Sequence, residues 1–240
     1  MTATPDMTIR ELVAGDFRTA AVFERHGVDF CCHACQTLAE GCEEAGVDAG
    51  PLLQELEAIL ESPADAATRF NEWPLPSLVD HIVTRHHAYV RESLPRLLSH
   101  SRKIADVHGS RHPELARVAK LVEEVNDEMT SHMMKEEHIL FPYISNLARA
   151  AEGAGSRPMA PFGTVQNPIR MMEAEHESAG RAMAEMRSLT NGFRPPADAC
   201  GTYQVCLQEL EAFEQDLHAH VHLENNILFP KAARIEAALD

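Results

Sequence analysis

The stretch His132-Met-Met-Lys-Glu136-Glu-His-Ile-Leu-Phe-Pro142 recurs 88 residues later as His220-Val-His-Leu-Glu224-Asn-Asn-Ile-Leu-Phe-Pro230. Such a repeat indicates repeated architecture. On a helix, residues four apart lie on one face, so each copy directs an imidazole and a carboxylate toward one point. Ile139 and Ile227, seven residues after each His, are expected on the same face, which predicts that the polar pair points into the protein. A buried His beside a buried Glu is costly unless something binds them, and a metal ion meets that need.

Composition limits the classes of protein to which this chain can belong. Its 240 residues suffice for a small domain and a medium one, and 45% hydrophobic with 24% charged residues is ordinary for a globular protein. The formal net charge of −16 argues against nucleic acid and against an anionic membrane as partners. No apolar run approaches a membrane span, and the N-terminal residues lack the features of a signal peptide. We expect a cytoplasmic protein, either monomer or homodimer.

Four long stretches with helical periodicity follow one another in the second part of the chain, and no convincing strand pattern is present. They cover residues 77–107, 113–150, 168–191 and 198–238. Because helices joined by short connections pack as antiparallel neighbours, the sequence predicts an all-α fold with an up-down-up-down four-helix bundle at residues 77–240. Pro95, Pro142 and Pro230 are expected to kink or end their helices.

A small helical domain is expected before the bundle, at residues 1–62, with a linker at 63–76. Thr8 to Glu11 matches a capping box, and helices are expected to end at Gly27 and Gly46. Asp48 is a candidate N-cap for a further short helix. A domain of this length has a thin core, so we expect it to lean on its neighbour or on a partner.

The first and third helices of the predicted bundle also offer one histidine each, as a duplication requires. His87 and His176 are 89 residues apart, close to the spacing of the main repeat. The candidate ligands are therefore four His and two Glu in two equivalent halves: His87, His132, Glu136, His176, His220 and Glu224. This set suits a pair of metal ions bridged by the carboxylates, and imidazole with carboxylate favours iron, zinc or copper over calcium or magnesium. A structural zinc bundle stays open as an alternative.

Other residues of the bundle are not assigned as metal ligands. Glu128, one turn before His132, and Glu175, beside His176, are candidates to orient ligands or relay protons, and a solvated helix face is an equally good interpretation of both. The remaining histidines are interpreted as solvated or as supports for the ligands: His26, His81, His86, His100, His108, His112, His138, His218 and His222. The pairs Met133-Met134 and Met171-Met172 are expected to fill the core.

Four cysteines gather in one short segment near the N-terminus: Cys31, Cys32, Cys35 and Cys42. In a reducing cytosol such a cluster indicates metal or redox chemistry in preference to a disulfide framework. Cys42, Cys200 and Cys206 are interpreted as small packing residues.

These motifs together resemble the RIC (repair of iron centres) proteins over essentially the whole chain. The His and Glu positions of the two repeats, with His87 and Glu175-His176, are similar to that family's hemerythrin-like di-iron domain, and Asp29-Phe-Cys-Cys32 followed by Gln36-Thr-Leu38 is similar to its small double-cysteine domain. The resemblance implies two iron ions as cofactor. The four histidines would be terminal ligands, Glu136 and Glu224 would be bridging carboxylates, and Cys31 and Cys32 would be functional thiols.

One departure from that family lies beside the cysteine pair. Where the family commonly has Gly-Gly, this chain has His33-Ala34 followed by Cys35, which creates a Cys32-x-x-Cys35 spacing with a redox or metal-binding meaning of its own. Whether this third thiol binds metal, forms a regulatory disulfide or has no role is open at this point.

The resemblance implies repair of iron–sulfur clusters damaged by nitric oxide or oxidative stress, with the damaged iron–sulfur proteins as partners. Two mechanisms fit: donation of iron, and binding of nitric oxide with its reduction to nitrous oxide, which would make the protein an enzyme. The alternative from another class is a hemerythrin-type carrier or sensor of oxygen or nitric oxide without turnover. The reactive thiols argue against a simple carrier.

Overall fold

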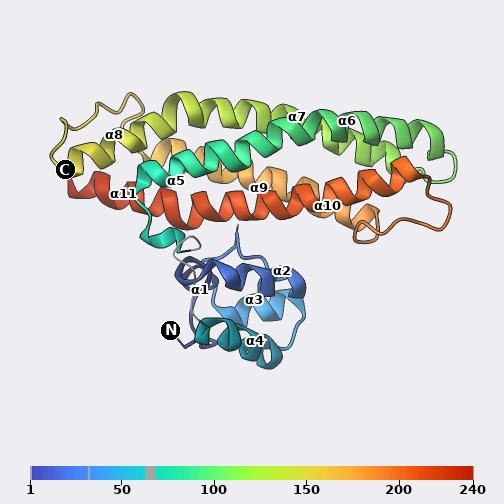
Figure 1. Ribbon diagram of the computed structural model, residues 1–240, viewed down its shortest axis with the longest axis horizontal. Helices are drawn as coiled ribbons and strands as arrows, with labels where there is room; N and C mark the ends of the chain where they lie inside the picture. Colours follow the sequence, from blue (N-terminus) through green and yellow to red (C-terminus); the bar gives the residue numbers. More distant parts are fainter. Residues whose placement is uncertain (1, 32, 63–68, 240) are drawn as a thin grey trace. The chain divides into compact units, whose positions relative to one another are not determined.

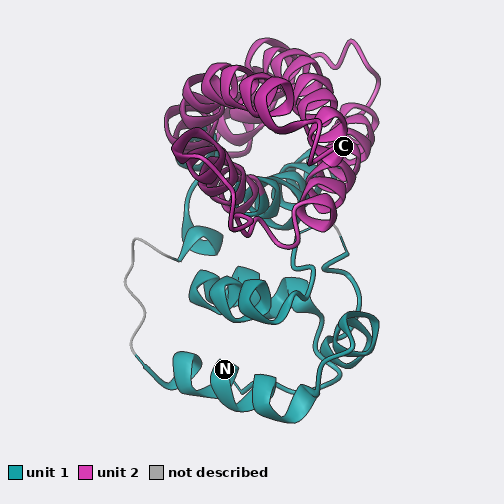
Figure 2. Cartoon of the chain, turned by 90° about the vertical axis from the view of Figure 1, so that its right-hand side faces the viewer, with its two compact units in different colours: residues 1–79, 218–240 teal, residues 80–217 magenta. Residues whose placement is uncertain are grey.

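The computed structural model describes residues 2–31, 33–62 and 69–239, and across these residues it is helical with no strand. Figure 1 labels the helices along the chain. The chain divides into two compact units (Figure 2): residues 1–79 with 218–240, and residues 80–217. Two helices, α5 (Leu75–His81) and α10 (Gly201–His222), contribute residues to both units. The C-terminal part of the predicted bundle is thus grouped with the N-terminal residues.

Short capped helices form the N-terminal part of the first unit. They are α1 (Ile9–Gly15), the 3-10 turn η1 (Phe17–Thr19), α2 (Ala20–His26), α3 (Leu38–Ala45), α4 (Ala49–Glu61) and the 3-10 turn η3 (Phe70–Glu72). The capping box predicted at Thr8 is confirmed, and Thr37 with Glu40 forms a second, unpredicted one. Gly27 and Gly46 end their helices in the left-handed conformation, as expected, and Asp48 caps α4. Of the predicted linker, residues 63–68 lie outside the described residues, and α5 begins inside the remainder at Leu75.

Four long helical stretches form the predicted bundle, and three of them contain a π-helical turn. They are α5 with η4 (Ile82–His87) and α6 (Ala88–His108); α7 (Glu114–Lys135) with η5 (Glu136–Leu140) and α8 (Phe141–Ala151); α9 (Gln166–Leu189); and α10 with η6 (Leu223–Leu228) and α11 (Phe229–Ala238). The predicted all-α class is confirmed, since the four expected stretches are all helical.

Ion pairs inside the second unit establish that neighbouring helices run antiparallel. The pairs are Arg91–Glu137 and Arg102–Glu123 between the first and second stretches, Arg117–Glu185 and Lys135–Glu175 between the second and third, and His86–Asp216 and His100–Glu209 between the first and fourth. Each pair of neighbouring helices is joined by two of these ion pairs. From one ion pair to the other, the residue number rises on one helix and falls on its neighbour, which is the up-down-up-down arrangement. Figure 2 shows the helices of this unit nearly end-on. Buried leucines, valines and methionines form its core.

The motif Ile-Leu-Phe-Pro corresponds to a local change of helix geometry in both copies of the repeat. The π-helical turns η5 and η6 start at or just before Glu136 and Glu224, and Pro142 and Pro230 then lie in the first turns of α8 and α11. Proline is well tolerated there, because the first turn of a helix leaves backbone N–H groups without intrahelical acceptors. Pro95, by contrast, lies inside α6 without ending it.

Ile139 corrects one expectation. Its side chain is 52% exposed, whereas Ile227, the equivalent residue of the second copy, is 2% exposed. The π-helical turn adds a residue to the helical turn and so rotates the seventh residue after the histidine away from the ligand face. Ile227 is buried because α1 and η3 pack against η6 within the first unit. Met134 and Met171 are likewise exposed, and only Met133 and Met172 fill the core.

Candidate metal centre

Three of the four long stretches carry a candidate ligand in a π-helical turn. His87 is the last residue of η4, Glu136 is the first of η5, and Glu224 lies in η6. Such turns occur frequently at functional sites, because the extra residue moves a side chain out of the regular helical register. His87, Glu136 and Glu224 thus share the same local helix geometry.

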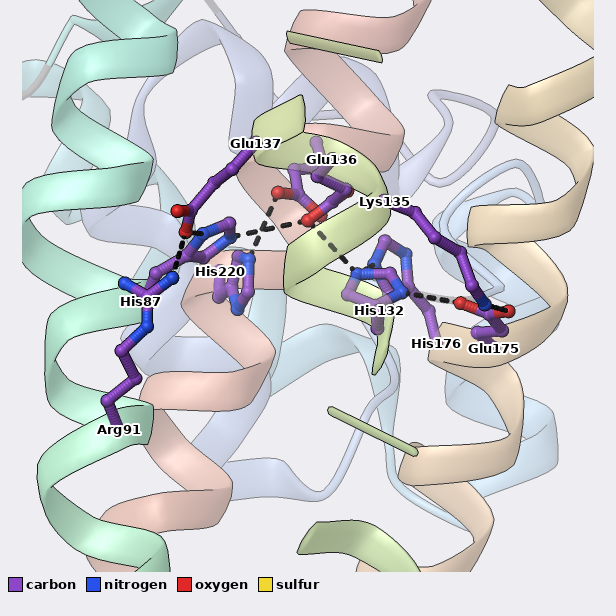
Figure 3. Close-up of polar contacts among 10 residues, drawn as sticks. His87, Arg91, His132, Lys135, Glu136, Glu137, Glu175, His176 and His220 are labelled. Atoms are coloured by element: carbon purple, nitrogen blue, oxygen red, sulfur yellow. Dashed lines mark hydrogen bonds and ion pairs between the residues drawn. The ribbon is translucent and has the colours of Figure 1, made fainter. Parts of the chain in front are cut away.

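Within the second unit, four of the predicted ligands lie together (Figure 3). The Oε2 atom of Glu136 is 3.3 Å from Nε2 of His87 and 3.2 Å from Nε2 of His132. The Nε2 atom of His176 is 3.0 Å from Nε2 of His132. All four residues are at most 1% exposed.

Within the first unit, the second copy of the repeat forms a similar pair. The Nε2 atom of His220 is 3.0 Å from Oε1 of Glu224, and both side chains are completely buried. His220 is in the last turn of α10 and Glu224 is in η6, so the helical spacing of four residues alone brings them together.

Two sets of buried side chains meet the geometric requirement for holding a cation. His87, Glu136, His220 and Glu224 make one set, and His132, Glu136, His176 and Glu224 make the other; within each set, the candidate ligand atoms lie within 4.8 Å of one another. Glu136 and Glu224 belong to both sets. Nitrogen and carboxylate oxygen donors in this mixture suit iron, zinc or copper, so the residues present fit a transition-metal centre.

Two further carboxylates bind the outer nitrogens of two of these histidines. His87 Nδ1 lies 2.6 Å from Oε1 of Glu137, which Arg91 also binds. His132 Nδ1 lies 2.9 Å from Oε2 of Glu175, which Lys135 also binds. A carboxylate that accepts from Nδ1–H fixes the tautomer, so the Nε2 lone pair of each ring points toward Glu136. Figure 3 shows both chains of contacts.

The pKa values of Glu137 and Glu175 are lowered, which keeps both carboxylates ionised as hydrogen-bond acceptors. The hydrogen bond from His132, assisted by Lys135 and opposed by partial burial, lowers the pKa of Glu175 to about 2. Partial burial acts to raise the pKa of Glu137, but hydrogen bonds from His87 and Arg91 lower it overall. Both side chains are therefore anions at neutral pH and remain acceptors for Nδ1–H.

Of the two carboxylates proposed as supports from the sequence, only Glu175 contacts a candidate ligand. Glu128 is exposed on α7 and accepts a hydrogen bond of 3.3 Å from Ser178, which fits the alternative interpretation of a solvated helix face. Glu137 was missed, although its position next to Glu136 and the basic residue four places after His87 are signals that could have identified it. Three of the histidines interpreted as solvated or supporting are buried: His86, His108 and His222.

Replacing Glu137 or Glu175 with glutamine is expected to lower the affinity for metal about 10- to 100-fold, because the amide holds the imidazole less firmly and can stabilise the wrong tautomer. The measurement is a competition titration with a coloured chelator. Glu128→Gln is the matched control, one turn from His132 on the same helix, and should leave the affinity unchanged. An equal loss in all three variants would contradict the support role.

The cysteine segment is described at three of its four positions, since Cys32 lies outside the described residues. Cys31 is buried, and its backbone N–H and its thiol both contact Oδ1 of Asp29, at 2.8 and 3.3 Å. Cys35 is exposed. Cys42 and Cys206 are buried as expected, whereas Cys200 is exposed, with its sulfur 3.2 Å from His108 Nε2, and is not a packing residue.

Comparison with known proteins agrees with this architecture. Residues 78–232 match the model of the hemerythrin HHE cation binding domain, and residues 5–60 match a domain of unknown function, DUF542. The iron-sulfur cluster repair protein YtfE of Escherichia coli O157:H7 is 35% identical over 227 residues, which cover 95% of this chain and 96% of that protein. The protein of the same name from Citrobacter koseri has the same identity and coverage, and that from Escherichia fergusonii is 34% identical.

The fold and the site define a hemerythrin-like, cation-binding helical bundle with an N-terminal cysteine domain. The chain belongs to the family of the hemerythrin-domain iron–sulfur cluster repair proteins, which confirms the resemblance found in the sequence. In residues 2–31, 33–62 and 69–239, no helix has both the length and the hydrophobicity needed to cross a membrane.

Proposed function

We propose that this protein repairs damaged iron–sulfur clusters and that it holds two iron ions for this purpose. The observation that carries the proposal is the pair of buried His/Glu sets that share Glu136 and Glu224. The relatives that match 95% of the chain are named as iron-sulfur cluster repair proteins, which supports the same function here. The cysteine domain and these names favour repair over the alternative of an oxygen or nitric oxide carrier or sensor.

In this proposal His87 and His220 would hold one iron and His132 and His176 the other, and Glu136 and Glu224 would be carboxylates shared by both sets. Two ferrous ions would supply iron for transfer and two electrons for reduction of nitric oxide. The four imidazoles are neutral donors, so the inner charge comes only from the two carboxylates. Such a site releases ferrous iron more readily than a cage of thiolates, as a donor must.

The remaining residues orient and protect this centre. Glu137 and Glu175 keep the Nε2 lone pairs of His87 and His132 directed inward, and the burial of all six ligands excludes bulk water. Cys31 and Cys32 would pass iron or nitric oxide between the bundle and the damaged protein. We propose the cytoplasm as the site of action, in a response to nitric oxide or oxidative stress.

The test uses an iron–sulfur enzyme inactivated by nitric oxide and incubated anaerobically with the iron-loaded protein. Recovery of the cluster's visible absorbance and of the enzyme's activity is expected with the wild-type chain. Replacing Cys31 and Cys32 together with alanine should keep the iron content and lose most of the recovery, because the thiols act after iron is bound. Nitrous oxide in the headspace distinguishes nitric oxide reduction from iron donation.

Two outcomes would contradict the proposal. Full recovery with the double cysteine variant would remove the thiols from the mechanism. No recovery with the wild-type chain, together with reversible binding of oxygen or nitric oxide, would establish the carrier or sensor alternative. Cys206→Ala is the matched control, since this buried cysteine of α10 lies in the second unit.

A further inference from the structure

The two copies of the repeat differ in what surrounds them. The first copy exposes Met134 and Ile139, whereas the second buries the equivalent residues, His222 and Ile227. His138 of the first copy is also exposed, whereas its counterpart Asn226 is 5% exposed. Every residue of η6 is buried, but only Glu136 and Leu140 of η5 are. The second copy therefore carries side chains that serve a contact absent from the first.

That contact is with the cysteine segment, within the first unit, and Asn226 is at its centre. The Nδ2 atom of Asn226 lies 3.2 Å from the carbonyl oxygen of Phe30 and 3.3 Å from that of Cys31. It also donates to Nδ1 of His222 at 3.1 Å. Arg10 Nε donates to the Asn226 Oδ1 atom at 2.8 Å, which fixes the orientation of the amide. One side chain thus joins α1, η6 and the two peptide groups that lead into the cysteine pair.

Aromatic packing completes the contact. The ring of His222 lies 5.5 Å from that of Phe17 and 6.0 Å from that of Phe30, measured between centroids. His218, one turn earlier on α10, lies 5.9 Å from the Phe30 ring, and its Nδ1 is 3.0 Å from Oε2 of Glu24. Phe30, the residue before Cys31, is thereby held on both its ring and its carbonyl oxygen.

We propose that Asn226 is a positioning residue that fixes the backbone of the Cys31 segment, and that the second copy of the repeat is specialised to bind this segment. The inference rests on the proposed function, in which Cys31 transfers iron or nitric oxide. Asn226 is two residues from Glu224 in the same π-helical turn. The turn that supplies the candidate ligand Glu224 therefore also supplies the side chain that binds the backbone of the thiol segment.

The test measures how fast iodoacetamide alkylates Cys31 in the anaerobic, iron-loaded protein, with the exposed Cys35 of the same chain as internal reference. Asn226→Asp keeps the acceptor for Arg10 but removes the donor to the two carbonyl groups. We expect the Cys31 rate to rise about tenfold relative to Cys35, which corresponds to the net loss of one to two hydrogen bonds. Iron content should stay unchanged, and recovery in the cluster assay should fall. His138→Ala, at the equivalent position of the first copy, should change none of these.

Arg10→Met provides a second route if the Asn226 variant does not fold, because it only releases the orientation of the amide; a smaller rise in the Cys31 rate is expected. An unchanged rate of Cys31 alkylation in a folded, iron-loaded Asn226→Asp protein would contradict the proposal that Asn226 fixes the Cys31 segment. A faster rate with undiminished cluster recovery would overturn the positioning role. A faster rate of Cys31 alkylation in the variant, together with a wild-type chain that repairs no clusters, would support the contact made by Asn226 and refute the proposed function instead.

Discussion

Glu136→Gln is expected to remove both of the proposed iron ions, whereas His87→Ala should remove one. The reason is that Glu136 belongs to both sets of candidate ligands and His87 to only one. Elemental analysis of anaerobically purified protein should give about two irons per chain for the wild type, about one for His87→Ala and close to none for Glu136→Gln. Glu224→Gln should behave as Glu136→Gln does, because it is the other shared carboxylate.

Glu214 provides the matched control for this experiment. Like Glu136 and Glu224 it is a buried carboxylate, but it lies in α10 and is bound by Arg187 instead of histidine. Glu214→Gln should therefore keep the full iron content. Full iron in Glu136→Gln would contradict the assignment of shared carboxylates, and loss of both irons in His87→Ala would show that the two sets do not fill independently.

The six candidate ligands could be chosen from the sequence because each signal is local or repeated. His132 and Glu136 share a helix face, as do His220 and Glu224, and the duplication then directs attention to one histidine on each remaining helix. The class of fold followed from helical periodicity for the same reason. Spacing along one helix is independent of how helices pack, so these predictions needed no knowledge of tertiary contacts.

The supporting residues could not be found in this way. Glu137 reaches His87 across 50 positions of sequence, and Asn226 reaches Arg10 across 216. Such contacts depend on which helix faces meet and at what register, and a single sequence does not encode that directly. The π-helical turns add to the difficulty, because they shift the face of every residue that follows, as Ile139 demonstrates.

Removing the metal is expected to destabilise the fold strongly, and the reason lies in the same hydrogen bonds. Since Nδ1 of His87 and of His132 donates outward, the Nε2 lone pairs of both rings face Oε2 of Glu136 at 3.3 and 3.2 Å. Without a metal, these lone pairs and the carboxylate oxygen repel one another. A cation bound by all three replaces this repulsion with attraction. Iron at about 1,000 times its dissociation constant would add about 4 kcal/mol to the free energy of unfolding. Chelation should then lower the midpoint of thermal unfolding by about 10 °C.

A glutamine double variant tests whether repulsion in the buried centre is the cause. In Glu136→Gln with Glu224→Gln, side-chain amides can donate to the Nε2 atoms, so the metal-free variant should unfold at a higher temperature than the metal-free wild type. With iron present the order should reverse, because only the wild type gains binding energy. Calorimetry with and without chelator makes the comparison. If the metal-free variant is the less stable of the two, the carboxylates stabilise the empty fold, and the centre is built for structure as much as for iron.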